Sequence, residues 1–258
     1  MPANPVPLPP HDRADFRSHG EIIKRGFVAD HLVERAATLV NDWYERDLDP
    51  EQLAAYTQRT FAPELGEHPD LLALFSDSGA ADLAGELLGG TAPVRTVQVQ
   101  IRVPPAHLDT NQPEKRMHVD GVACPHLDPA ELRTFSLLIV VVLSEITDPT
   151  GGALRYVPGG HLQMADWFAR EWQLGITEQV PPHLDAEAGT PFLARPGDLL
   201  AMHHLVPHAV GNNHTATPRV MAYFRVSHPA HSSHRLASLR DPWLDYPGLI
   251  SADIPQQL

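Results

Sequence analysis

The chain has 258 residues, of which 43% are hydrophobic and 20% are charged. This length and composition predict one globular domain with a closed core. A formal net charge of −13 and the lack of a basic run exclude nucleic acid as an expected partner. The single cysteine, Cys124, excludes an intrachain disulfide and a cysteine-based zinc cluster. No apolar run reaches the roughly 18 residues of a membrane span, so we expect a soluble, cytoplasmic protein without a membrane partner.

The first third of the chain predicts helices behind a proline-rich arm. Residues 1–13, "MPANPVPLPPHDR", are expected to form a flexible, extended arm, because proline lacks an N–H donor and fixes its own backbone angle. Residues 20–92 are expected to form a helical buttress. Apolar residues recur at helical spacing from residue 32 to residue 43, and a second helix is predicted over residues 80–88, ended by Gly89.

Residues 94–228 change to short runs typical of strands. "VRTVQVQIRVP" alternates strictly, and "RTFSLLIVVVLSEI" is long enough to cross a core. Further strands are predicted in "GGALRYVPGG", "TPFLARPGDLLAM", "VPHAVGN" and "RVMAYFRVS". We therefore expect a single domain over residues 1–258 that is mainly β with flanking helices. Its core over 94–228 is an antiparallel sandwich or jelly roll, and residues 229–258 form a C-terminal cover.

Two potential metal ligands are one residue apart in "KRMHVDGVA". On a strand, residues i and i+2 point to the same side, so His118 and Asp120 can both reach one ion. An exposed loop histidine beside a turn-forming aspartate is the alternative interpretation. A third ligand is needed, and two histidines with one carboxylate are the ligand set of non-haem Fe(II) oxygenases. The candidates for the third ligand are His203, His204, His208 and His214.

An arginine at a fixed offset adds to this interpretation. Arg219 follows His208 by 11 residues. A 2-oxo acid can chelate such an iron through its 1-carboxylate and keto oxygens, which leaves one position for dioxygen. The distal carboxylate of 2-oxoglutarate then requires a planar, bidentate partner, which arginine provides and lysine does not. Arg219 is therefore the candidate partner of that carboxylate.

Four motifs in order resemble the phytanoyl-CoA dioxygenase-like branch of the Fe(II)/2-oxoglutarate oxygenases: "MHVD", "GGALRYVPGGH", "PGDLLAMHHLVPHAVGNN" and "PRVMAYFRV". The resemblance implies a double-stranded β-helix, a jelly roll of the cupin-like kind. It implies that His118, Asp120 and His208 hold Fe(II), that Arg219 anchors 2-oxoglutarate, and that O2 is a co-substrate. The implied activity is oxidation of a C–H bond coupled to decarboxylation of 2-oxoglutarate to succinate and CO2.

The resemblance also narrows the reaction. Related halogenases lack the carboxylate ligand so that chloride can bind, whereas Asp120 is present here. Hydroxylation of a small organic molecule is therefore favoured, in the biosynthesis of a specialised metabolite. The same ligands also serve desaturation, epoxidation and cyclisation, and the oligomeric state is not predicted.

Further residues are candidates by parity. Gln98, Gln100 and Arg102 share one face of a predicted strand. If this face points into the jelly roll, Gln100 contacts cofactor or substrate; if it is solvated, the intervening apolar residues face the core. Tyr223 and Arg225 share the parity of Arg219 and are candidate substrate contacts, although Arg225 could instead form a structural ion pair. Arg116, next to the metal motif, is a candidate contact of 2-oxoglutarate.

Two other interpretations stay open. Two histidines and one aspartate around zinc could activate water in a hydrolase or isomerase, although nothing in that chemistry requires Arg219. A non-catalytic binding protein could retain the fold. A second metal site in the tail, where His228, His231 and His234 follow each other at three-residue steps, is disfavoured because Pro229 and the serine-rich context predict a loop.

Overall fold

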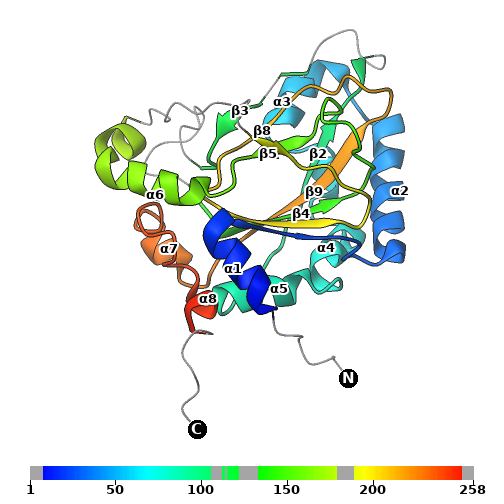
Figure 1. The fold of residues 1–258 in the computed structure, drawn as a ribbon. Coiled ribbons are helices and arrows are strands. Elements are labelled where there is room, and N and C mark those ends of the chain that lie inside the picture. Colours follow the sequence, from blue (N-terminus) through cyan, green and yellow to red (C-terminus); the bar gives the residue numbers. More distant parts are fainter. Residues whose placement is uncertain (1–7, 106–111, 114, 122–132, 179–188, 252–258) are drawn as a thin grey trace, which may run out of the picture.

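Two antiparallel β-sheets form the centre of the molecule in the computed structural model, which describes residues 8–105, 112–113, 115–121, 133–178 and 189–251 (Figure 1). The larger sheet has the strand order β1-β7-β4-β9-β2, and the smaller has the order β3-β8-β5-β6. The strands are β1 Glu21–Lys24, β2 Gln98–Arg102, β3 Lys115–His118, β4 Leu137–Val142, β5 Leu154–Tyr156, β6 Thr190–Pro191, β7 Leu199–His203, β8 His208–Val210 and β9 Arg219–Val226. The predicted antiparallel core is confirmed.

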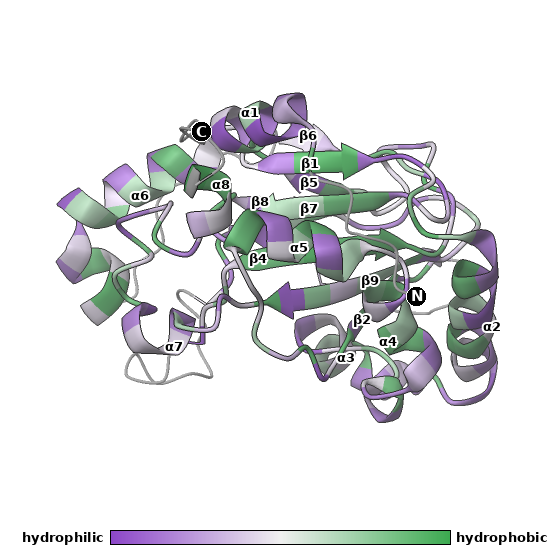
Figure 2. Ribbon diagram, turned by 90° about the horizontal axis from the view of Figure 1, so that it is seen from below, coloured by the Kyte–Doolittle hydropathy of each residue, from purple (hydrophilic) through white to green (hydrophobic). Residues whose placement is uncertain are grey.

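Strand β4 shows how the core is divided. All six residues of its "LLIVVV" run are buried, because β4 lies between β7 and β9 and is covered on both faces. Leu137, Ile139 and Val141 pack in a cluster with the N-terminal helices. The alternate residues, Leu138, Val140 and Val142, pack in the cluster between the two sheets. The strand is accordingly hydrophobic along its length in Figure 2.

Helices cover the outer face of the larger sheet and one end of the molecule (Figure 1). Residues of α2, α4 and α5 share the hydrophobic cluster that contains the outward face of β4. None of the described helices is both long and apolar enough to cross a membrane. The helices are α1 Pro10–His19, α2 Asp30–Arg46, α3 Leu53–Gln58, α4 Pro69–Ser76, α5 Ala80–Leu88, α6 Gly160–Arg170, α7 His231–His234 and α8 Pro247–Ser251, with 3-10 turns at Pro50–Gln52 and Pro63–Leu65 and a π-helical turn at Gln173–Thr177.

Three local predictions are corrected by this structure. Residues 21–24, in the predicted helical buttress, form strand β1 and pair with β7, so the larger sheet begins before residue 94. Residues 10–13 belong to α1 and not to an extended arm, because Pro10 stands in the first turn, where its missing N–H costs nothing. The helix is held in place by Phe16, which is fully buried against Tyr246, with ring centroids 5.3 Å apart. The loop predicted in the tail contains the short helix α7. Residues 1–7 of the arm and Cys124 lie outside the described residues.

Candidate active site

The metal motif lies where β3 and β8 pair in the smaller sheet. His118 ends β3 and is the register partner of His208, the first residue of β8, with ring centroids 4.6 Å apart. Val119, between His118 and Asp120 in the sequence, points the opposite way, into a cluster with Phe168 of α6 and Leu205. Burial of Val119 thus fixes the alternation that turns His118 and Asp120 to the same side.

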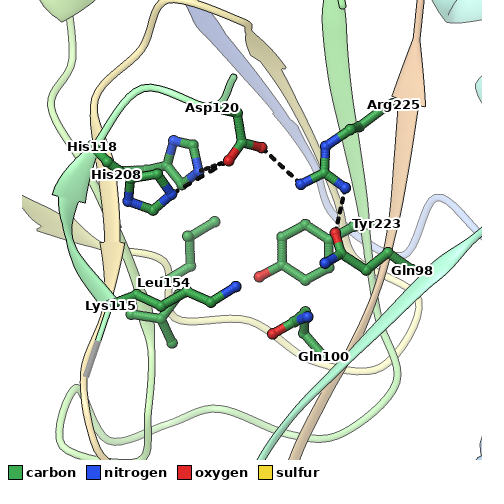
Figure 3. A pocket seen from close by; sticks show the side chains of 10 residues that line it. Gln98, Gln100, Lys115, His118, Asp120, Leu154, His208, Tyr223 and Arg225 are labelled. Carbon is green, nitrogen blue, oxygen red and sulfur yellow. Dashed lines mark hydrogen bonds and ion pairs between the residues drawn. The ribbon is translucent and has the colours of Figure 1, made fainter. Parts of the chain in front are cut away.

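The hydrogen bonds of the two imidazoles determine which nitrogen atoms are available. His118 Nδ1 lies 2.6 Å from the carbonyl oxygen of Arg116, and His208 Nδ1 lies 3.0 Å from that of Val206. A carbonyl only accepts, so each Nδ1 carries the proton and each Nε2 keeps a free lone pair. Asp120 Oδ1 lies 3.3 Å from His118 Nε2 and 3.9 Å from His208 Nε2. These three atoms lie within 4.8 Å of one another and fit a divalent metal ion (Figure 3).

The protonation states also suit a metal. Burial alone would raise the pKa of the Asp120 carboxyl, but the Arg225 guanidinium, 2.9 Å away, and the two imidazoles hold it well below its usual range. Burial, reinforced by the neighbouring His118 ring, lowers the pKa of His208 to about 4. At neutral pH the cluster therefore offers one carboxylate and a neutral His208 imidazole, which are the forms that bind metals.

The cluster opens into a small pocket that encloses about 20 Å³. Besides the three candidate ligands, four of the predicted residues line it: Gln98, Gln100, Tyr223 and Arg225. The two glutamines of the β2 face therefore point to the pocket, while Val99 and Ile101 pack in the core beneath the helices. Gln98 and Gln100 both donate to the carbonyl oxygen of Arg59. The side chains that line the pocket are those of Gln98, Gln100, Lys115, His118, Asp120, Leu154, His208, Val210, Tyr223 and Arg225 (Figure 3).

Arg102 and Arg219 lie behind the pocket wall. They are register partners on β2 and β9, and their exposed fractions are 1% and 2%. Arg102 donates to the carbonyl oxygens of Pro113 and Val210, and Arg219 to those of Gly152 and Gln100. Neither is among the described residues that line the pocket. Burial lowers the pKa of Arg219, and the neighbouring Tyr223 phenol, which lines the pocket, opposes that shift.

The remaining candidates separate clearly. Arg116 is exposed and contributes its backbone carbonyl, not its side chain, to the site, so the structure does not support its predicted contact with 2-oxoglutarate. His203 is fully buried, with its Nε2 2.7 Å from the carbonyl oxygen of Pro242. His204 is buried beside Ser136. His208 is thus the one of the four histidines that lies with His118 and Asp120.

Lys115 is a pocket residue that the sequence did not indicate. It is three residues before His118, a spacing that places two side chains on opposite faces of a regular strand. A β-bulge changes this: three steps along β3, from Lys115 to His118, match two along β8, from Val210 to His208. Both side chains therefore face the pocket. Burial lowers the pKa of the Lys115 ammonium to about 8, and Asp120 opposes the shift.

Two histidines on paired strands of a jelly roll, with a carboxylate two residues after one of them, are the arrangement of the non-haem iron oxygenases. The family model described as phytanoyl-CoA dioxygenase (PhyH) matches residues 16–221, and the chain belongs to this family. The expected family and its cofactor class, Fe(II) with 2-oxoglutarate, are thereby confirmed. No curated protein matches the sequence.

Solved structures share the fold. EctD from S. alaskensis, solved with 2-oxoglutarate and 5-hydroxyectoine, superposes with a TM-score of 0.60 at 19% identity, over 87% of this chain and 78% of that one. The epimerase SnoN from nogalamycin biosynthesis gives a TM-score of 0.57 at 17% identity, over 83% and 80% of the two chains. The carbocyclase SnoK from the same biosynthesis gives 0.53 at 16%, over 90% and 94%.

Proposed function

We propose that the protein is an Fe(II)/2-oxoglutarate-dependent dioxygenase that hydroxylates a C–H bond of a small organic molecule. The observation that carries the proposal is the hydrogen bonding of His118 and His208. Both rings are held by backbone carbonyls so that their Nε2 lone pairs converge beside the Asp120 carboxylate. Membership of the PhyH family supports the reaction class.

His118, Asp120 and His208 are the proposed iron ligands. Bound there, Fe(II) would supply activation of O2, coupled to conversion of 2-oxoglutarate to succinate and CO2. The residues around it provide an environment for a dianion. Four cationic side chains lie in or directly behind the pocket, whereas Asp120 is the single carboxylate among the described residues that line it; the four cations are Arg102, Lys115, Arg219 and Arg225.

Within this environment Lys115 and Arg219 have different proposed roles. The Lys115 side chain points into the pocket in Figure 3 and can pair directly with a carboxylate of 2-oxoglutarate. Arg219 is fixed by two carbonyl oxygens next to Tyr223, and its proposed role is to attract the distal carboxylate by its charge from outside the lining of the pocket. Gln100 keeps its amide oxygen toward the pocket, because its nitrogen donates to Arg59.

Hydroxylation is the proposed outcome because Asp120 occupies the ligand position that chloride would need. The neighbours named above comprise EctD, solved with 2-oxoglutarate and 5-hydroxyectoine, an epimerase and a carbocyclase, the last two from nogalamycin biosynthesis. This range supports a small-molecule substrate and a role in specialised metabolism, with epimerisation, desaturation and ring formation as the competing outcomes.

The test is spectroscopic and needs no substrate. Fe(II) and 2-oxoglutarate, added anaerobically to the apoprotein, should produce the weak visible charge-transfer band of the chelate. The band should vanish in His208→Ala and persist in His204→Ala, the matched control, since His204 is buried beside Ser136 and outside the cluster. A folded wild-type protein without the band contradicts the proposal. Tight binding of Zn(II) by a folded protein that gives no band with Fe(II) and 2-oxoglutarate would favour the zinc hydrolase or isomerase.

A further inference from the structure

A second, larger hollow lies beside the metal pocket; we call it the basic groove. It measures about 510 Å³, and its walls come mainly from two segments, residues 133–134 and 227–235, with Ala92 as a further lining residue. These segments meet because β4 and β9 are antiparallel neighbours, with Leu137 opposite Val226. The segment that leads into β4 and the segment that follows β9 therefore leave the sheet at the same edge.

The ionisable residues that line the groove are all basic. Arg133, Arg235, His228 and His231 contribute basic groups, and Thr134 and Ser232 contribute hydroxyls. No aspartate or glutamate is among the described residues that line it, although the chain has 32 acidic residues against 19 lysines and arginines. The guanidinium groups and the Ser232 hydroxyl form a binding surface for phosphate or carboxylate oxygen atoms, whereas Thr134 and His231 hydrogen-bond to each other.

The floor of the groove is held rigidly from below. His231 Nδ1 lies 2.6 Å from Asp245 Oδ2, and its Nε2 lies 2.9 Å from Thr134 Oγ1, so the ring joins the two walls. The backbone N–H of His228 donates to Ser136 Oγ, and Ser136 Oγ donates to Asp245. Groups positioned before a ligand arrives bind it with a smaller loss of conformational entropy.

The groove shares a wall with the metal pocket. Gly121, next to Asp120, has a φ of +81°, and a Cβ atom there would lie 3.0 Å from the carbonyl oxygen of Arg133 and 3.1 Å from Thr134 Cγ2. Arg225 pairs with Asp120 on one side, and its guanidinium lies 5.5 Å from the Phe135 ring centroid on the other. The chain that forms the groove thus touches the turn that carries Asp120.

The two hollows differ in size. The metal pocket encloses about 20 Å³, whereas the groove is large enough for the body of a small organic molecule. We propose that the basic groove binds an anionic group, a phosphate ester or a carboxylate, of the molecule that is oxidised at the neighbouring metal pocket. This inference rests on the proposed function and adds to it that the substrate is an organic acid or a phosphate ester.

The first experiment measures anion binding without metal. Inorganic phosphate, and in a parallel arm acetate, is titrated into the full-length, metal-free protein at constant ionic strength, while the ring resonances of His228 and His231 are followed by NMR. Arg133→Gln should weaken binding of the preferred anion roughly tenfold, as expected for a lost charge-assisted hydrogen bond. The matched control is Arg46→Gln on α2, which removes an exposed guanidinium paired with Asp42 and should change the affinity less than twofold. Equal affinity in wild type and Arg133→Gln overturns the site.

The second experiment assigns the anion to the substrate. Candidate compounds are offered in three forms, neutral, carboxylate and phosphate ester, and succinate release above the uncoupled rate is measured. The acidic forms should be preferred by wild type, and Arg133→Gln should reduce that preference roughly tenfold. Preference for the neutral forms overturns the assignment even if phosphate binds. Absence of any 2-oxoglutarate consumption contradicts the proposed function instead, and the metal-free titration distinguishes the two failures.

Discussion

Two clusters in this molecule contain the same ligand types at the same spacing, yet they differ in what they can bind. His118, Asp120 and His208 form one, and His228, His234 and Asp245 form the other; in each, the three ligand atoms lie within 4.8 Å of one another. In the first, backbone carbonyls take the Nδ1 protons of both rings, and the Nε2 lone pairs converge on open space. The position of the protons, not the composition, distinguishes this cluster as the candidate metal site.

In the second cluster the protons point inward. Asp245 is fully buried and accepts from His231 Nδ1 at 2.6 Å, from His234 Nε2 at 2.5 Å and from the Ser136 hydroxyl at 2.7 Å. His228 Nδ1 accepts from the backbone N–H of Ala230, which places its own proton on Nε2. The carboxylate is saturated with donors, and the cluster holds the C-terminal segment against the sheet. We interpret it as a structural network.

The largest effect is expected from removing one candidate ligand of the first cluster. His208→Ala should lower Fe(II) affinity at least about 100-fold, because one of the three proposed ligands is lost. His234→Ala should leave about one iron atom per chain, since His234 gives its Nε2 proton to Asp245. Metal content after anaerobic loading measures both. A wild type that binds two metal ions, reduced to one by His234→Ala, would show that the second cluster is a metal site as well.

The second-largest effect is expected on stability, from a substitution in the structural network of Asp245. Asp245→Asn should lower the free energy of unfolding by about 3 kcal/mol, because three buried donors lose a charged acceptor. Burial would raise the pKa of Asp245, but its hydrogen bonds from His231, His234 and Ser136 hold it well below its usual range. Its contribution is therefore present above the unfolded-state pKa of about 3.9 and is lost as pH falls through the lower folded-state pKa.

Urea unfolding at pH 7 measures this loss. Asp166→Asn, at an exposed pair with Arg170 on α6, is the matched control and should cost under about 0.5 kcal/mol. Iron binding should be unchanged in Asp245→Asn. A loss of iron with unchanged stability would reverse the roles that we assign to the two clusters.

The sequence predicted those parts of the site that follow from strand alternation. His118 and Asp120 flank the buried Val119, and Gln98 and Gln100 face the pocket, because a period of two survives in the fold. Lys115 could not be predicted, since a bulge shifts its parity and no sequence signal marks that bulge. The burial of Arg219 next to Tyr223 was likewise hidden, because parity gives a face and not a depth.

The elements around the second cluster could not be predicted either, because they depend on tertiary contacts. Pro229 led to a loop being predicted at the tail histidines, and the short helix α7 forms there because Asp245, eleven residues beyond His234, supplies the acceptor. That contact depends on tertiary packing, as does the placement of α1 by Phe16 against Tyr246. The choice of His208 among four histidines depended on the family resemblance, and the pairing of β3 with β8 now accounts for it.

A third, smaller effect concerns His204, whose ring centroid lies 6.4 Å from that of His231. Burial lowers the pKa of His204 to about 4, against about 6.5 in an unfolded chain. Folding thus favours the neutral ring, so its stability contribution is complete above pH 6.5 and is lost as pH falls toward 4. We expect about 2 kcal/mol to be lost between pH 7 and pH 5. His204→Phe should flatten this slope in urea unfolding, while His11→Phe, at a ring 75% exposed, should not.

The smallest expected effect concerns the cations at the metal pocket. Four cationic side chains surround that pocket, whereas each described partner of the Asp245 carboxylate in the second cluster is a histidine or a hydroxyl. Lys115→Met removes one of the four cations around the pocket and should weaken 2-oxoglutarate binding roughly tenfold, measured by anaerobic titration of the charge-transfer band. Lys115→Arg should retain most of the affinity. Binding of 2-oxobutanoate, which lacks the distal carboxylate, should hardly change in Lys115→Met if the ammonium pairs with that group. An equal loss for both ligands would place Lys115 at the carboxylate that chelates the metal, and no loss for either would leave Arg219, acting from outside the lining of the pocket, as the anchor of the co-substrate.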